Sequence, residues 1–202
     1  MALTLGQRVL KRTFDIVVAT IGLIATGWLI LIAYVAATID TRMNGFFTQV
    51  RVGHKGRLFK VIKLRTMWNI AGITTVVTAD GDPRITRIGR LLRKTKIDEL
   101  PQLINVLLGH MSFVGPRPDV PGFADLLEGE DRIVLNVRPG ITGPATLAYR
   151  KEEELLAAQP DPERYNSEVI FPTKTAINRK YVQEYSFTDD LGYLWQTVFA
   201  RN

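Results

Sequence analysis

Residues 96–118, KIDELPQLINVLLGHMSFVGPRP, place two carboxylates before an apolar stretch and an arginine between two prolines after it. The apolar residues recur at spacings of three and four, which predicts a helix with one face packed against a core. They are Ile97, Leu100, Leu103, Ile104, Leu107 and Leu108. Pro101 suits the first turn, where a missing N–H costs nothing, and Gly109 suits the end. We therefore expect Asp98 and Glu99 at the start of this helix.

A carboxylate in that position is suited to chemical reactivity. It faces free backbone N–H groups and the positive end of the helix dipole, which favours its ionised form and attracts anions. Ionised, Asp98 can act as a nucleophile. The alternative is structural, with Asp98 capping the helix and Glu99 complementing the dipole. The spacing alone leaves both interpretations open.

Composition sets the outer limits. A chain of 202 residues has room for one compact domain with a normal core. Lys and Arg number 26 against 20 acidic residues, which gives a net charge of +6 and suits an anionic partner. With no Cys and two His, a disulfide framework, a thiolate zinc site and a His-rich metal site are not expected.

Residues 16–39 contain no charged side chain, which predicts a membrane helix. Such a helix would be about 36 Å long, slightly more than the hydrocarbon core. A secretory signal peptide is the alternative, but its apolar region is only about 7 to 15 residues. We expect residues 1–43 to form a membrane-inserted segment with basic flanks. Residues 44–202 would form a cytoplasmic catalytic domain lying on the membrane face.

The charges around this segment bear on its topology. Basic residues lie on both sides of it, whereas a single span usually has them on the cytoplasmic side only. They are Arg8, Lys11 and Arg12 before it, and Arg42, Arg51, Lys55 and Arg57 after it. This pattern predicts a re-entrant helix that returns to the same side, with Gly22 and Gly27 as weak points for a bend. A straight span is the alternative.

Basic residues also recur beyond the membrane segment. Residues 44–67 predict turns and short strands, whose Lys60, Lys63 and Arg65 would line a phosphate site or a lipid-headgroup face. Residues 85–95 predict a basic amphipathic helix, lying on an anionic membrane or presenting a solvated charged face, with Arg93 beside Asp98.

Two stiff loops follow, each with an arginine. Arg117 lies in the first and Arg138 in the second, VRPGITG, and either side chain would bind a phosphate or pair with a structural carboxylate. Further helices are predicted over 151–159, 162–170 and 174–185, and a final one after Ser186. The expected class is α+β, mostly helical: a monotopic membrane protein with interfacial helices around a small β element.

The motifs together resemble a known family. They are KLRTM at 63–67, DPRITRIGRLLRKTKIDELPQL at 82–103, MSFVGPRP at 111–118 and VRPGITG at 137–143. In this order they resemble the bacterial monotopic phosphoglycosyl transferases. The resemblance implies transfer of a sugar phosphate from a UDP-sugar to polyprenyl phosphate, at the cytoplasmic face of the bacterial inner membrane. It would be the first membrane step of bacterial polysaccharide, O-antigen or glycoprotein assembly.

The resemblance also implies roles for individual residues. Asp98 would be the nucleophile that carries the phosphosugar covalently, Glu99 its acidic partner, and Mg²⁺ would be held at this pair. Arg93, Arg117, Lys63 and Arg138 would bind phosphates. Membrane lipids are expected partners and nucleic acid is not, and the enzyme could act alone or as a homodimer.

Two departures from the family pattern matter. The family usually breaks its membrane helix with Ser-Pro, where this chain has Thr26, Gly27 and Trp28, so a bend must rely on Gly27 and on Thr20 or Thr26 bonding back to the backbone. His110 replaces a usual Asp and would alter metal binding or pH dependence. A noncatalytic membrane scaffold is the alternative function.

Overall fold

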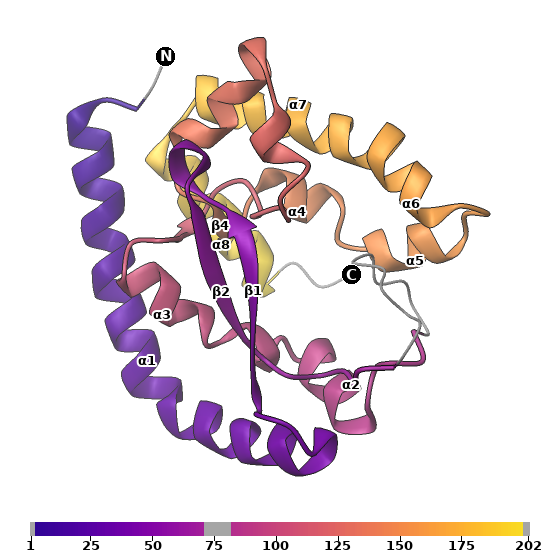
Figure 1. Ribbon diagram of the computed structural model, residues 1–202. Coiled ribbons are helices and arrows are strands. Elements are labelled where there is room, and N and C mark those ends of the chain that lie inside the picture. The colour runs from indigo at the N-terminus through magenta and orange to yellow at the C-terminus, as the bar shows by residue number, and fades with distance from the viewer. Residues whose placement is uncertain (1–2, 71–81, 200–202) are drawn as a thin grey trace.

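The computed structural model describes residues 3–70 and 82–199. Figure 1 shows one long helix, α1 (Leu5–Thr41), bent around an assembly of shorter helices and small sheets. The predicted mostly helical α+β class with a small β element is therefore confirmed.

Two small sheets form the β element of the described chain. β1 (Phe46–Val52) and β2 (Leu58–Leu64) make an antiparallel hairpin through the short turn η1 (His54–Gly56). β3 (Ser112–Val114) pairs in parallel with β4 (Gly140–Thr142). At this second sheet the backbones approach so closely that a Cβ on Gly140 would lie 2.2 Å from the Gly115 nitrogen. Only glycine fits there, and the contact fixes the loop that follows β3.

The helix predicted to include Asp98 and Leu108 is divided. A 3₁₀ turn, η2 (Ile97–Glu99), is followed by the six-residue helix α3 (Gln102–Leu107). Lys96 starts η2 in the left-handed region at φ 58°, and Pro101 has no N–H to continue an α-helical ladder. The prediction of one continuous helix was therefore wrong.

The inward face of α3 also differs from the prediction. Leu108 is 62 % exposed, whereas Asn105 is 1 % exposed. The Asn105 side chain accepts a hydrogen bond from Ile62 N at 2.9 Å and donates one to Lys60 O at 2.8 Å. The open edge of β2 needs hydrogen-bond partners, so an amide is buried where the apolar periodicity predicted leucines.

The remaining predicted helices occur in the predicted order with shifted ends, whereas the short helix directly after β4 was not predicted. α2 (Arg87–Lys94) is capped by Thr86, whose hydroxyl accepts a hydrogen bond from Gly89 N at 2.7 Å. After β4 the α-helices are α4 (Pro144–Ala148), α5 (Glu152–Ala157), α6 (Pro162–Tyr165), α7 (Phe171–Gln183) and α8 (Phe187–Phe199). The 3₁₀ segments η3 (Ala124–Leu126) and η4 (Gly129–Asn136) lie between β3 and β4, and the π-turn η5 (Asn166–Ile170) links α6 to α7. α7 packs against η4 and α4.

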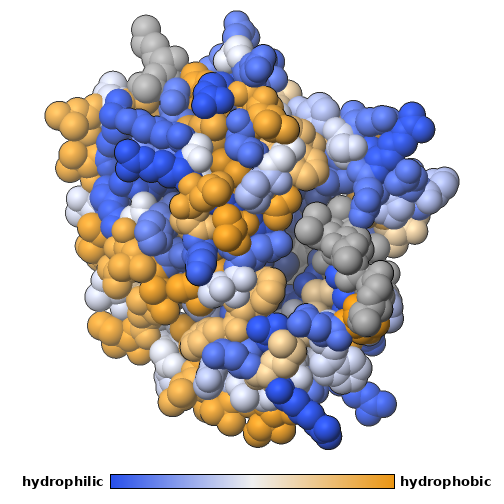
Figure 2. All heavy atoms as spheres, viewed as in Figure 1, coloured by the Kyte–Doolittle hydropathy of each residue, from blue (hydrophilic) through white to orange (hydrophobic). Residues whose placement is uncertain are grey.

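α1 has the character of a membrane helix. Among the described helices it is the one long and apolar enough to cross a bilayer. Its small residues Ala19, Ala33 and Ala37 are at most 4 % exposed and contact the rest of the chain. Large apolar side chains such as Ile24 and Trp28 are 79 % and 64 % exposed, and Figure 2 shows apolar atoms along the outer side of the helix. In water this apolar face would be unfavourable, so membrane association fits the fold.

α1 bends without a proline. Figure 1 shows the change in direction, although the helix is continuous from Leu5 to Thr41. The Thr20 hydroxyl donates to Ile16 O at 2.8 Å, and the Thr26 hydroxyl donates to Gly22 O at 2.7 Å. The predicted back-bonding is therefore confirmed, and such bonds commonly bend helices.

Both limbs of α1 contact the same folded body. In the first limb, Lys11 forms a buried ion pair with Asp190 of α8 at 2.5 Å, and Asp15 accepts a hydrogen bond from the Ser112 hydroxyl at 3.0 Å. In the second limb, Ala33 and Ala37 pack in one cluster with Leu64 and Leu92. The two ends of the apolar helix are thus held together by the domain that follows it.

Candidate active site

The predicted nucleophile lies in a buried turn. Asp98 is the middle residue of η2 and is 6 % exposed. Its Oδ1 atom is buried and has no hydrogen-bond partner among the residues that the structure describes. A buried acceptor without a partner costs about 1–3 kcal/mol, so such an atom is a candidate for contact with a ligand or metal ion.

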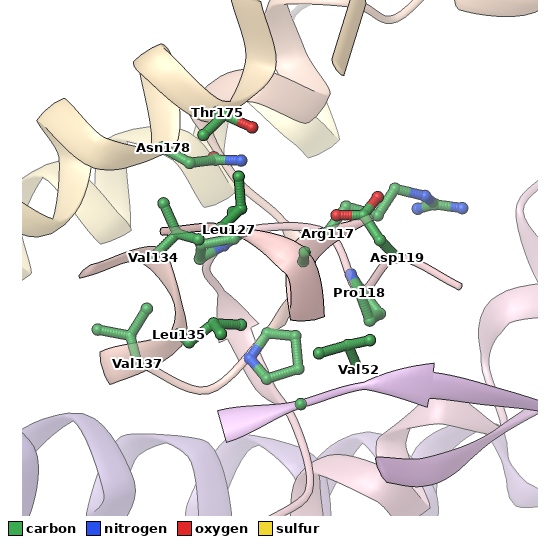
Figure 3. Close-up of a pocket in the computed structure, with 14 residues that line it drawn as sticks. Val52, Arg117, Pro118, Asp119, Leu127, Val134, Leu135, Val137, Thr175 and Asn178 are labelled. Carbon is green, nitrogen blue, oxygen red and sulfur yellow. The ribbon is translucent and has the colours of Figure 1, made fainter. Parts of the chain in front are cut away.

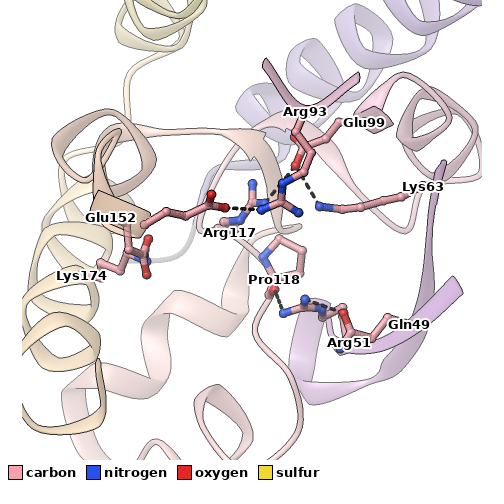
Figure 4. A network of polar contacts seen from close by, with 10 residues as sticks. Gln49, Arg51, Lys63, Arg93, Glu99, Arg117, Pro118, Glu152 and Lys174 are labelled. Atoms are coloured by element: carbon pink, nitrogen blue, oxygen red, sulfur yellow. Dashed lines mark hydrogen bonds and ion pairs between the residues drawn. The ribbon is translucent and has the colours of Figure 1, made fainter. Parts of the chain in front are cut away.

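Glu99, next to it, forms ion pairs with two cations. Its Oε1 atom accepts from Lys63 Nζ at 2.8 Å and from Arg117 Nη2 at 3.0 Å (Figure 4). Lys63 comes from β2, and Arg117 comes from the loop after β3 that Gly115 and Gly140 hold in place. The structure thus brings Lys63 and Arg117, from two distant parts of the chain, to the turn that carries Asp98 and Glu99.

The two carboxylates have different electrostatics. Burial, and then the charge of Glu99, raises the pKa of Asp98 above the usual Asp range, although Lys63 and Arg93 oppose the shift. Burial would also raise the pKa of Glu99, but the charges of Arg117 and Lys63 outweigh it and bring that pKa well below its usual range. Glu99 therefore stays ionised and holds the cations in position beside Asp98.

Arg93, in the last turn of α2, supplies a further positive charge that lowers the pKa of Asp98. Its guanidinium forms an ion pair with Glu153 of α5. The Glu153 side chain is half exposed, so the pair lies at the rim of the site. Sequence patterns gave no signal for this contact, because the partners are 60 residues apart.

Arg138 does not join this cluster. Its Nε donates to Gly109 O at 2.8 Å, just beyond the C-terminus of α3, whereas Asp98 precedes α3. His110 lies at that same far end, where its ring contacts Phe59 with centroids 5.9 Å apart. The geometry therefore does not support the expected phosphate contact of Arg138 or the expected effect of His110 on a metal at Asp98.

Further polar residues around the site escaped the sequence patterns. Gln102 is 2 % exposed, and its Nε2 is an unpartnered buried donor one turn beyond Asp98. Burial raises the pKa of Asp119 to about 6, although the charges of Lys174 and Arg51 act in the opposite direction. Gln102 lies three residues after Glu99 and Asp119 two residues after Arg117, but neither belongs to a periodic pattern.

A small cavity lies next to this site and is distinct from it. Thr175 and Asn178 of α7 line one side, with Arg117 and Asp119 at its edge (Figure 3). Its volume is about 30 Å³, room for water and far less than a nucleotide needs. Lys63, Arg93 and Arg117, and not this cavity, are the feature suited to a diphosphate.

The residues present fit a magnesium ion in part. No group of three or more His, Cys, Asp or Glu that could hold a metal occurs in the described ranges. Mg²⁺, however, usually takes only one or two carboxylates and completes its shell with water and substrate phosphates. The unpartnered Asp98 oxygen beside Glu99 satisfies that smaller requirement.

Comparison with known proteins identifies the family. The family model described as bacterial sugar transferase matches residues 6–201. The exopolysaccharide production protein ExoY of Sinorhizobium fredii is 32 % identical, with 94 % of this chain and 84 % of that protein aligned. The UDP-glucose:undecaprenyl-phosphate glucose-1-phosphate transferase of Caulobacter vibrioides is 35 % identical, with 93 % and 68 % aligned.

The protein with the same transferase name from Escherichia coli is 36 % identical, but this chain, 96 % aligned, spans only 40 % of its length. The similarity therefore extends over nearly all of this chain in relatives of quite different size. The family inferred from the ordered motifs is confirmed: this chain belongs to the bacterial sugar transferases.

Proposed function

We propose that this protein transfers a sugar 1-phosphate from a UDP-sugar to polyprenyl phosphate through a covalent intermediate on Asp98. The observation that carries the proposal is the buried, unpartnered Asp98 oxygen beside a cluster of Lys63, Arg117 and Arg93. A carboxylate nucleophile and phosphate-binding cations are the parts that two successive phosphoryl displacements require. Relatives named as sugar 1-phosphate transferases support the same reaction.

In the first displacement, an Asp98 oxygen attacks the phosphorus that carries the sugar. The bond from that phosphorus to the bridging oxygen breaks, and UMP leaves with its electron pair. The product is an aspartyl-phosphosugar. In the second, an oxygen of polyprenyl phosphate attacks the same phosphorus, the acyl phosphate bond breaks, and polyprenyl diphosphate sugar leaves while Asp98 is regenerated.

The cations explain how the site favours these steps. Arg117 and Lys63 are fixed by Glu99, so their remaining N–H groups are positioned before the donor binds. Charge that develops on the phosphoryl oxygens is then stabilised without reorganisation of the site. Asp98 and Glu99 would hold Mg²⁺, which neutralises phosphate charge when bound.

The membrane placement follows from α1. Both of its limbs contact the domain that carries Asp98, which favours a re-entrant helix with its two ends on one side of the bilayer. Basic residues flank both ends, which favours the cytoplasmic face. The donor would then arrive from the cytoplasm and the acceptor from the membrane. The product would enter assembly of an exported glycan.

Intact-protein mass spectrometry tests this function. Wild type and Asp98→Asn are incubated with Mg²⁺ and a panel of UDP-sugars, without acceptor. We expect one sugar-phosphate mass gain in wild type alone, with one UMP released per protein. Mass gain in Asp98→Asn would overturn the assignment of the nucleophile. No adduct and no UMP, even with polyprenyl phosphate present, would favour a noncatalytic scaffold.

A further inference from the structure

Two arginines meet at the end of α3 that is remote from Asp98. Arg12 of α1 donates from Nη1 to Val106 O at 2.6 Å and from Nη2 to Leu107 O at 2.8 Å. Arg138, from the loop before β4, donates from Nε to Gly109 O at 2.8 Å. These bonds fix both guanidinium groups around the last carbonyls of one short helix.

The charge of Asp15 offsets that of Arg12 only in part, because the charge of Arg138 acts on Arg12 more strongly. Within residues 3–70 and 82–199, neither Arg12 nor Arg138 forms an ion pair with a carboxylate. Asp15, one turn beyond Arg12, accepts hydrogen bonds from Ser112 Oγ and Phe113 N, both at 3.0 Å. Burial, and then the charges of Arg138 and Lys55, lowers the pKa of His54 below its usual range. Positive charge therefore accumulates here.

Arg138 also retains unused donors. Only its Nε has a hydrogen-bond acceptor among the described residues, and both terminal nitrogens are without one. A guanidinium held by Nε presents its remaining N–H groups in a fixed plane, the geometry that binds two oxygens of one phosphate. We call Arg12 and Arg138 the basic patch.

The basic patch lies at the boundary between polar and apolar surface. Arg12 precedes the uncharged residues 16–39 by one turn. Ile16, one turn further along α1, is 41 % exposed, and Leu108, next to the Leu107 carbonyl that Arg12 binds, is 62 % exposed. Figure 2 shows hydrophilic side chains gathered between the first limb of α1 and the β1–β2 hairpin, with apolar atoms of α1 beside them. Headgroup phosphates lie at this level when the apolar residues are in the acyl region.

We propose that the basic patch binds the headgroup phosphate of an anionic glycerophospholipid, at a site separate from Asp98 and Glu99. The two guanidinium groups, neither of which forms an ion pair with a carboxylate, match the phosphate charge, and the exposed Ile16 and Leu108 match the acyl chains. A free phosphate would use only the charged half of this surface. The inference rests on the proposed membrane placement of α1 and not on the transfer chemistry.

Photolabelling of the full chain in nanodiscs tests the proposal. The discs contain phosphatidylcholine with a minority of phosphatidylglycerol that carries a photoreactive group near its headgroup. Peptide mapping of wild type should find label on residues 106–112 and near Arg138. Arg138→Gln should reduce that label severalfold, whereas Arg164→Gln should not, because Arg164 lies on α6 and pairs with Glu168. Unlabelled phosphatidylglycerol should compete.

Several results would overturn the proposal. One is wild-type label confined to other segments such as α2. This result is read from the wild-type protein alone, so it does not depend on whether a variant folds. Another is unchanged label in an Arg138→Gln protein that melts at the wild-type temperature. Displacement by millimolar inorganic phosphate would indicate a free-phosphate site. Displacement by polyprenyl phosphate alone would indicate the acceptor. UMP release from the same discs is scored separately, so failure of the transfer reaction leaves this result readable.

Discussion

Asp98 and Glu99 are adjacent, yet their surroundings favour opposite protonation behaviour. Asp98 is buried without a hydrogen-bond partner for Oδ1, so its charge is costly in the folded protein. Glu99 is compensated by Lys63 and Arg117. A residue whose burial costs stability and serves chemistry is typical of an active site.

This contrast predicts opposite stability effects. Asp98→Asn removes a buried charge of raised pKa and should stabilise the fold at neutral pH by about 1 kcal/mol, while abolishing UMP release. Glu99→Gln leaves Lys63 and Arg117 without a counter-charge and should destabilise by about 1–3 kcal/mol, less than a fully buried pair because Arg117 is partly exposed. Thermal unfolding of both variants in one detergent measures the difference, and equal shifts would contradict it.

The same residues predict a pH dependence. The first displacement needs ionised Asp98, so its rate should fall as pH drops through a pKa that lies above the usual Asp range. Lys63→Gln removes a charge that lowers this pKa, so the acid limb should move to higher pH. Lys63→Arg keeps the charge and serves as control. Single-turnover UMP release across pH measures the limb, and movement to lower pH in Lys63→Gln would refute this role.

Helix α5 contacts helix α2 through the ion pair between Glu153 and Arg93. The Glu153 carboxylate occupies Arg93, a guanidinium proposed to bind the donor diphosphate. The donor must therefore displace Glu153 or bind beside it. The neighbouring Glu154 instead pairs with Lys151 at 3.8 Å, with both side chains 63 % exposed.

Glu153→Gln should therefore strengthen donor binding. Loss of a half-exposed ion pair of ~0.4–1 kcal/mol corresponds to a KM for the UDP-sugar lower by about two- to fivefold. Glu154→Gln is the matched control and should leave KM unchanged. Steady-state kinetics at low ionic strength give the comparison. A higher KM in Glu153→Gln would mean that the carboxylate positions Arg93 instead of competing for it.

For the whole molecule, local patterns in the sequence predicted elements better than contacts. β2, α2 and α8 follow from alternation and helical periodicity, which are local properties. Lys63 meets Glu99 across 36 residues of sequence, and no local pattern encodes such a meeting. Arg138 shows the converse, because its proline-glycine loop resembles that of Arg117 while the fold places it at the other end of α3.

The topology of α1 affects the whole molecule, because it decides whether the contacts at both ends of this helix persist in a bilayer. Lys11 near one end contacts α8, and Ala37 near the other packs with β2 and α2. A straight helix through about 30 Å of hydrocarbon would separate these contacts onto opposite sides of the membrane. Both contacts survive together only if the helix enters and returns.

Single-cysteine labelling should therefore find both ends of α1 on one face. The chain has no Cys, so Leu5→Cys and Met43→Cys each introduce one thiol, at positions 77 % and 36 % exposed. In sealed vesicles of known orientation, a membrane-impermeant maleimide should label both from the cytoplasmic side only. Trp28→Cys, 64 % exposed on the apolar face, should be protected until detergent is added. Labelling of Leu5→Cys and Met43→Cys from opposite sides would require a spanning helix, and the Lys11–Asp190 and Ala37–Leu64 contacts could not then coexist.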